Sequence, residues 1–67
     1  MTIMQFIKGT FEQCEQYNTI VCAGEKYQGV TQRWADVIEC DGYYAILYNP
    51  NYNTNLELTT EINPINL

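Results

Sequence analysis

The stretch TQRWADVIECDGYYAILY, residues 31–48, decides the fold. Asp41-Gly42 is among the stronger short signals for a β-hairpin, because both central residues of a type I′ turn need a positive φ angle. On either side of this dipeptide the chain is rich in aromatic and β-branched residues, which favour strands. The sequence therefore predicts a strand over Thr31–Cys40, a turn at Asp41-Gly42 and a returning strand over Tyr43–Tyr48.

The length of this turn sets the pairing of the two strands. A two-residue turn pairs Cys40 with Tyr43 and Ile38 with Ala45. A three-residue turn with a bulge shifts this register by one residue and exchanges the partners. The residues of the turn alone leave both registers open.

Upstream of the hairpin, residues 10–26 repeat with the period of an α-helix. Thr10 and Gln13 form the pattern of a capping box, in which each side chain bonds to the other residue's backbone amide. Asn18 falls within the apolar stripe of this helix, where it should be hydrogen-bonded or lie at the edge. The stripe consists of Phe11, Cys14, Tyr17, Val21 and Cys22.

Shorter elements follow from the remaining sequence. A β-prone run precedes the helix at Ile3–Ile7 and is broken by Gly9, and an alternating run over Leu56–Ile62 predicts an edge strand. The proline and asparagines of residues 49–55 favour a loop. Residues 63–67 begin with Asn-Pro and are expected to form a tail.

These elements predict a single α+β domain over residues 1–67. The N-terminal helix should end at Gly24, as a left-handed cap, or just before Gly29. It is expected to pack on a small antiparallel sheet built around the 31–48 hairpin. A chain of this size buries only about 60% of the surface that its unfolded form exposes, so its stability alone should be marginal.

Composition restricts the chemistry that the protein can perform. The chain contains eight acidic and three basic residues, a net charge of −5, with no histidine and no serine. Ser–His and Cys–His catalysis and histidine-containing metal sites are therefore excluded. Lys8, Lys26 and Arg33 are scattered, whereas nucleic-acid binding needs clustered cations. No apolar run approaches the roughly 20 residues of a membrane-spanning helix.

The carboxylates and cysteines are the remaining candidates for chemistry. Asp36 is flanked by apolar residues on both sides, and one such acid on a hairpin is more typical of an edge residue or a partner for Arg33 than of a catalytic acid. Three cysteines without a C-x-x-C pair predict reduced thiols in the cytoplasm. Cys14 and Cys22 lie on the apolar stripe, and Cys40 is expected to be the most exposed. We expect no enzymatic activity, no cofactor and no metal.

The helix can cover only one face of the hairpin. One face carries Val37, Tyr44, Ile46 and Tyr48. The other carries Trp34, Ile38, Ala45 and Leu47. Whichever face the helix leaves open needs another cover, which a second copy of the chain or the folded-back segment 56–67 would supply. The candidate interface residues are Trp34, Val37, Tyr44, Ile46, Leu47 and Tyr48.

Three linked motifs carry a resemblance to known sequences. An Ala-Gly-x-x-Tyr stretch at 23–27 is followed by Thr-x-x-aromatic-Ala-Asp at 31–36 and by Asp-Gly-x-Tyr-Ala-Ile at 41–46. Over residues 11–48 this pattern resembles short uncharacterised open reading frames of tailed phages, including marine and cyanobacterial ones. The resemblance implies a viral origin, a small α+β fold and an accessory role, and it transfers no functional residues.

Two functions are consistent with these expectations. The first is a non-enzymatic structural or interaction protein that self-associates, located in a host cytoplasm or in a virion. The alternative is an acidic inhibitor that occupies a basic site on a host protein. The two differ in salt dependence, because an inhibitor held by charge should release its partner as the salt concentration rises.

Overall fold

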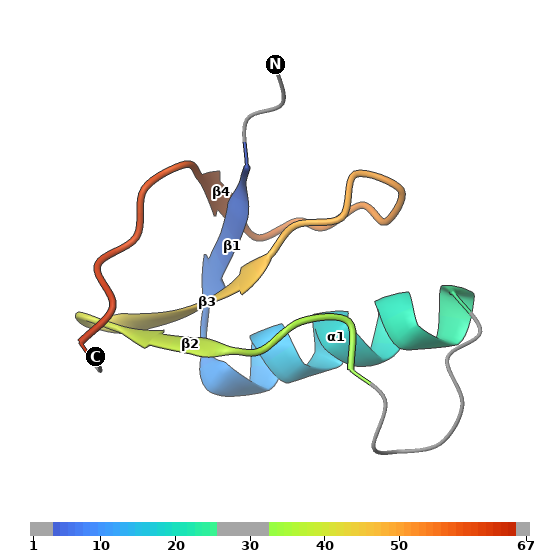
Figure 1. The fold of residues 1–67 in the computed structure, drawn as a ribbon, viewed down its shortest axis with the longest axis horizontal. Coiled ribbons are helices and arrows are strands. Elements are labelled where there is room, and N and C mark those ends of the chain that lie inside the picture. The colour runs from blue at the N-terminus through green and yellow to red at the C-terminus, as the bar shows by residue number, and fades with distance from the viewer. Residues whose placement is uncertain (1–3, 26–32, 66–67) are drawn as a thin grey trace.

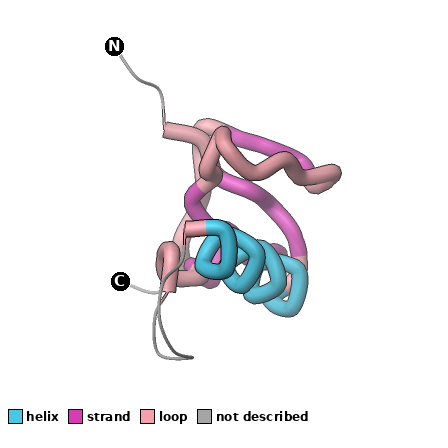
Figure 2. Tube along the Cα trace, turned by 90° about the vertical axis from the view of Figure 1, so that its right-hand side faces the viewer, coloured by secondary structure: helices cyan, strands magenta, loops and turns pink. Residues whose placement is uncertain are grey.

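The computed structural model describes residues 4–25 and 33–65, in which one helix packs on a four-stranded antiparallel sheet (Figures 1 and 2). The strand order β2-β3-β1-β4 places β1 inside the sheet and β2 and β4 at its two ends. The expected α+β fold is therefore confirmed. In chain order the elements are β1 (Phe6–Gly9), α1 (Phe11–Gly24), β2 (Ile38–Cys40), β3 (Tyr43–Leu47) and β4 (Glu57–Thr59).

The hairpin forms with the two-residue turn. Cys40 pairs with Tyr43 and Ile38 pairs with Ala45. Gly42 adopts a φ angle of 86°, in the left-handed region that glycine tolerates best. Of the two registers that the sequence left open, the one without a bulge is thus the one observed.

Gly42→Val is expected to lower the free energy of unfolding by about 1 kcal/mol or more. A Cβ atom at Gly42 would meet nothing within 4 Å, so the cost comes from the backbone angle and not from a clash. Gly42→Asn is the matched control, because asparagine tolerates the left-handed region. Thermal melts of the two variants should differ, and equal losses would mean that the φ angle does not matter.

The start of α1 agrees with the sequence prediction, and its end agrees in position but not in the conformation of the cap. The Gln13 backbone N–H donates to Thr10 Oγ1 at 3.1 Å, and the Thr10 N–H donates to Gln13 Oε1 at 2.9 Å, which completes the capping box. The helix does end at Gly24, but Gly24 is not a left-handed cap, since Glu25 takes the cap position with a φ of −87°. Gly24 is needed for space, because a Cβ there would overlap the ring of Tyr52.

The first strand of the hairpin is shorter than the predicted Thr31–Cys40. Residues 31 and 32 lie outside the described residues, and β2 begins only at Ile38. Asn18 explains part of the difference, because its Oδ1 accepts the backbone N–H groups of Trp34 at 2.6 Å and of Ala35 at 3.2 Å. Amides held in this way by the helix cannot join a strand ladder.

The core lies between α1 and one face of the sheet. On this face Ile7 of β1 pairs with Ile46 of β3, and both side chains are fully buried. Val37, Tyr44 and Tyr48 pack against the same cluster, so this is the face beneath the helix. The buried cluster consists of Ile7, Cys14, Tyr17, Val21 and Ile46.

The C-terminal segment corrects the prediction of a tail. The Asp41 N–H donates to the Asn63 carbonyl at 3.0 Å, and the Ile65 N–H donates to the Glu39 carbonyl at 3.1 Å. Residues 63–65 therefore extend the sheet beyond β2, and Figure 1 shows this segment returning from β4 to the hairpin. Pro64 lacks an N–H donor, but the Asn63 carbonyl and the Ile65 N–H on either side of it remain able to pair.

β4 lies at the edge of the sheet, as predicted, but it spans only the middle of the expected Leu56–Ile62 strand. Thr59 ends it, because Thr59 Oγ1 accepts the Glu61 N–H at 3.1 Å and lies 2.9 Å from the Glu61 carbonyl, to which it donates. This local turn diverts the chain from the strand direction. Residues 49–55 form the expected loop.

Candidate functional site

The six candidate interface residues do not form one open surface. Ile46 is fully buried, and Trp34 is half-buried, with its Nε1–H donating to the Leu47 carbonyl at 2.9 Å. Tyr48 is half-buried against Tyr17, with ring centroids 6.3 Å apart. Val37 and Tyr44 line a surface hollow. The hydrophobic alternation that suggested these residues thus arises mainly from their packing in or beside the core.

Part of the sheet face that points away from the helix is also buried. Ala45, on that face, is fully buried, and Cys40 is nearly so. Tyr43 lies on the same face and its hydroxyl accepts the Asn63 N–H at 3.1 Å, which ties the C-terminal segment across this end of the sheet. The C-terminal segment therefore meets the sheet at its β2 edge, whereas Leu56, which the sequence analysis offered as part of a cover for this face, packs against the core beneath the helix instead.

A groove opens where the hairpin turn, the start of α1 and the C-terminal segment meet. The hairpin turn and the C-terminal segment lie on the left in Figure 1. Two hollows of about 370 and 460 Å³ share Phe11, Glu39 and Tyr44 as lining residues, and the smaller one also reaches Ile65. We call the two hollows together the Phe11 groove. Phe11 was expected to be buried on the helix stripe, but it is the first helical residue and is 49% exposed.

The aromatic floor of the groove is fixed by a ring contact. Phe11 and Tyr44 lie edge to face with centroids 5.5 Å apart and an interplanar angle of 72°. This arrangement is favourable for aromatic pairs and limits the rotation of both side chains. At the other side of the smaller hollow, Ile65 is 56% exposed. The smaller hollow thus presents a mainly apolar surface to solvent.

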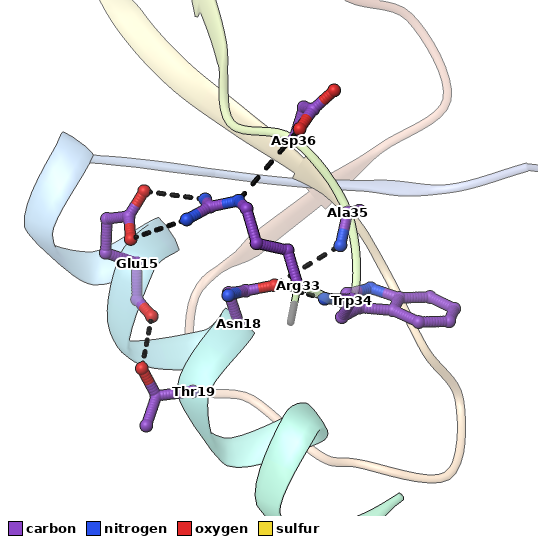
Figure 3. A network of polar contacts seen from close by, with 7 residues as sticks. All are labelled: Glu15, Asn18, Thr19, Arg33, Trp34, Ala35 and Asp36. Atoms are coloured by element: carbon purple, nitrogen blue, oxygen red, sulfur yellow. Dashed lines mark hydrogen bonds and ion pairs between the residues drawn. The ribbon is translucent and has the colours of Figure 1, made fainter. Parts of the chain in front are cut away.

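Both basic side chains in the described part of the chain lie against carboxylates. Arg33 Nη2 is 2.8 Å from Glu15 Oε2, and Arg33 Nε is 4.0 Å from Asp36 Oδ1, as Figure 3 shows. The expected pairing of Asp36 with Arg33 is therefore confirmed. Lys8 Nζ is 3.8 Å from Glu57 Oε2 and also lies 4.5 Å from the ring centroid of Tyr43.

The carboxylates near the groove are not balanced by cations. Glu39 lines both hollows, Glu12 directly follows Phe11, and Asp41 occupies the hairpin turn. Within residues 4–25 and 33–65, none of these three acids lies within ion-pair distance of Lys8 or Arg33. The groove lining therefore combines apolar side chains with the carboxylate of Glu39, and Glu12 and Asp41 are sequence neighbours of lining residues.

The three cysteines are thiols, and their exposure differs from the prediction. Cys40 is buried, not exposed, because the backbone of residues 63–65 pairs alongside it, whereas Cys22 is half-buried. Cys14 is fully buried. Burial, with smaller contributions from Cys40 and Glu15, raises the pKa of the Cys14 thiol to about 11, which keeps it protonated and unreactive at neutral pH.

The raised pKa of Cys14 predicts a loss of stability in alkali. Below the ordinary thiol pKa of 9.0, Cys14 is protonated in both the folded and the unfolded state, and its full contribution to the free energy of unfolding is present. Between pH 9.0 and about 11 the unfolded chain releases this proton first, so the free energy of unfolding should fall. Denaturant titrations should show a shallower fall for Cys14→Ala than for Cys22→Ala, and identical pH profiles would contradict the assignment.

A third hollow lies between α1 and the loop after β3. It has a volume of about 440 Å³ and is lined by amide side chains of the helix and loop, with Ile20 and Leu56 as apolar members. Tyr17 reaches it but is almost fully buried, because its hydroxyl is held by the backbone of Asn49 and Tyr52. No charged side chain lines this hollow, so its surface gives little indication of a ligand class.

The described part of the chain carries neither a metal-binding cluster nor a membrane-spanning helix. Residues 4–25 and 33–65 contain no group of three metal-ligating side chains. No helix in these segments has the length and hydrophobicity that crossing a bilayer requires. No family model, curated protein or solved structure matches the chain.

Sequence reasoning missed most of the groove. Phe11 was assigned to the core and Ile65 to a tail, so neither was considered as surface. One signal was present in the sequence: Glu39 interrupts the apolar run between Ile38 and Cys40, which requires a solvent-facing position there. Residue spacing could not show that this glutamate meets the start of the helix.

Proposed function

We propose that the protein is a non-enzymatic interaction protein that binds a basic surface of another protein. The observation that carries this proposal is the charge arrangement at the Phe11 groove. Lys8 and Arg33 are engaged by carboxylates, while Glu12, Glu39 and Asp41 have no cationic partner in the described part of the chain. Such an unbalanced acidic surface attracts a basic partner and speeds its association.

Capture from a cell lysate tests this function through its salt dependence. The immobilised protein should retain a small set of basic proteins in low salt and release them as the salt concentration approaches physiological and higher values. The retained proteins are identified by mass spectrometry, and an acidic protein of similar size serves as the control bait. Retention of no specific protein, or of partners that resist salt, would contradict the proposal.

Self-association, the first expectation from the sequence, is the second candidate. It is favoured by the open edge of β4, where Leu58 is 37% exposed beside unpaired strand backbone. Against it stands the repulsion between two chains that each carry a net charge of −5. We therefore propose a basic protein, and not a second copy of the chain, as the binding partner.

Light scattering separates the two candidates. At micromolar concentration we expect the mass of one chain, without concentration dependence. A mass of two chains that falls in Leu58→Asp but not in Ile20→Asp would support association through β4 instead. We further propose a cytoplasmic location, in a host cell or a virion, from the odd number of thiols and from the resemblance to phage reading frames.

A further inference from the structure

The Phe11 groove has the chemistry of a peptide-binding site. Its apolar residues Phe11 and Ile65 are 49% and 56% exposed. Large apolar side chains that are exposed together usually mark a contact surface. The edge-to-face contact with Tyr44 holds the Phe11 ring in place, so a ligand would pay little entropy to order it. The floor is therefore suited to receive an apolar side chain.

The rim of the groove selects the charge of the ligand. Glu39 lines both hollows, and Glu12 and Asp41 are the sequence neighbours of the lining residues Phe11 and Gly42. A segment that placed an acidic residue here would be repelled, whereas lysine or arginine would find a carboxylate without a competing cation from Lys8 or Arg33. This complementarity also disfavours a second copy of this acidic chain.

We infer that the Phe11 groove binds a peptide segment that carries apolar and basic side chains side by side. This inference rests on the proposed function and deepens it, because it locates the acidic surface and names the chemistry of its partner. An apolar side chain of the segment contacts Phe11, Tyr44 and Ile65. A neighbouring basic side chain pairs with Glu39.

Synthetic peptides test the inference directly. The probe is a fluorescein-labelled hexapeptide of alternating arginine and leucine, and the control probes replace leucine by glycine or arginine by glutamate. Fluorescence anisotropy at constant ionic strength should show the arginine–leucine peptide binding about ten-fold more tightly than either control. Equal binding of the two arginine peptides would overturn the inference, since the apolar floor would then contribute nothing.

Variants locate the site. Phe11→Ala, Ile65→Ala and Glu39→Gln should each weaken binding of the arginine–leucine peptide by about five-fold. The matched controls Ile20→Ala and Glu61→Gln remove an exposed apolar side chain and a carboxylate elsewhere and should leave binding unchanged. Circular dichroism melts show whether each variant is folded. If Phe11→Ala does not fold, Glu39→Gln and Ile65→Ala still test the site.

The outcomes distinguish this inference from the function on which it rests. Binding of the arginine–leucine peptide that all three groove variants leave unchanged would overturn the groove as the site, while the proposed function would stand. Failure of both arginine peptides to bind would overturn the groove and also count against a basic partner.

Discussion

Asn18→Ala is expected to lower the free energy of unfolding by about 2 to 4 kcal/mol, a large part of the stability of so small a domain. Asn18 is buried, and its side-chain oxygen accepts the backbone N–H groups of both Trp34 and Ala35 (Figure 3). Alanine would leave two partly buried donors without an acceptor. The segment before β2 would then lose its attachment to the helix.

The single tryptophan makes this loss visible locally as well as globally. Because Trp34 is the only tryptophan, its emission reports on the segment that Asn18 holds. We expect a red shift of the native emission and a lower denaturation midpoint in Asn18→Ala. The matched control Gln16→Ala removes an exposed amide from the same helix and should change neither. Equal behaviour of the two variants would show that the Asn18 bonds do not stabilise the fold.

Tyr17→Phe is expected to cost about 2 to 3 kcal/mol through the loss of a single hydroxyl. The Tyr17 hydroxyl accepts the Asn49 N–H at 3.0 Å and lies 2.8 Å from the carbonyl oxygens of Asn49 and Tyr52, to which it can donate. Asn49 is itself buried, so water cannot readily replace the lost bonds. The phenyl ring keeps the packing, which isolates the polar contribution.

Tyr48→Phe is the matched control for this substitution. The Tyr48 ring stacks near Tyr17, but its hydroxyl has no hydrogen bond within residues 4–25 and 33–65. Its removal should change the denaturation midpoint little. Hydrogen exchange should also show faster exchange of the Asn49 and Tyr52 amides in Tyr17→Phe. If the denaturation midpoint of Tyr17→Phe were as high as that of Tyr48→Phe, contacts other than the Tyr17 hydroxyl would hold the loop over residues 49–55.

The sequence predicted the elements that local chemistry controls. The capping box at Thr10 and the turn at Asp41-Gly42 depend on residues within four positions of each other, and both are present, the turn in one of the two registers that the sequence left open. The face beneath the helix follows from alternation along β3 and is one of the two that the pattern allowed. These features need no knowledge of distant contacts.

The features that the sequence did not predict depend on contacts between distant segments. Asn18 draws the amides of residues 34 and 35 away from the sheet, which shortens β2. The backbone of residues 63–65 pairs with β2 and buries Cys40. The same segment brings Ile65 to the groove, so the error about the tail also concealed the candidate site. Side-chain patterning cannot specify such backbone pairing, which every residue type except proline can make.

The central claim is that a basic and apolar peptide binds at the end of the molecule where the hairpin turn meets the start of α1. Amide chemical-shift perturbation by heteronuclear NMR tests it most directly, with the arginine–leucine peptide added to the labelled protein. We predict that the shifts concentrate at residues 9–12, 37–44 and 65 and saturate with the peptide. Shifts centred instead on β4 or on the hollow at Ile20, or no shifts at all, would contradict the claim.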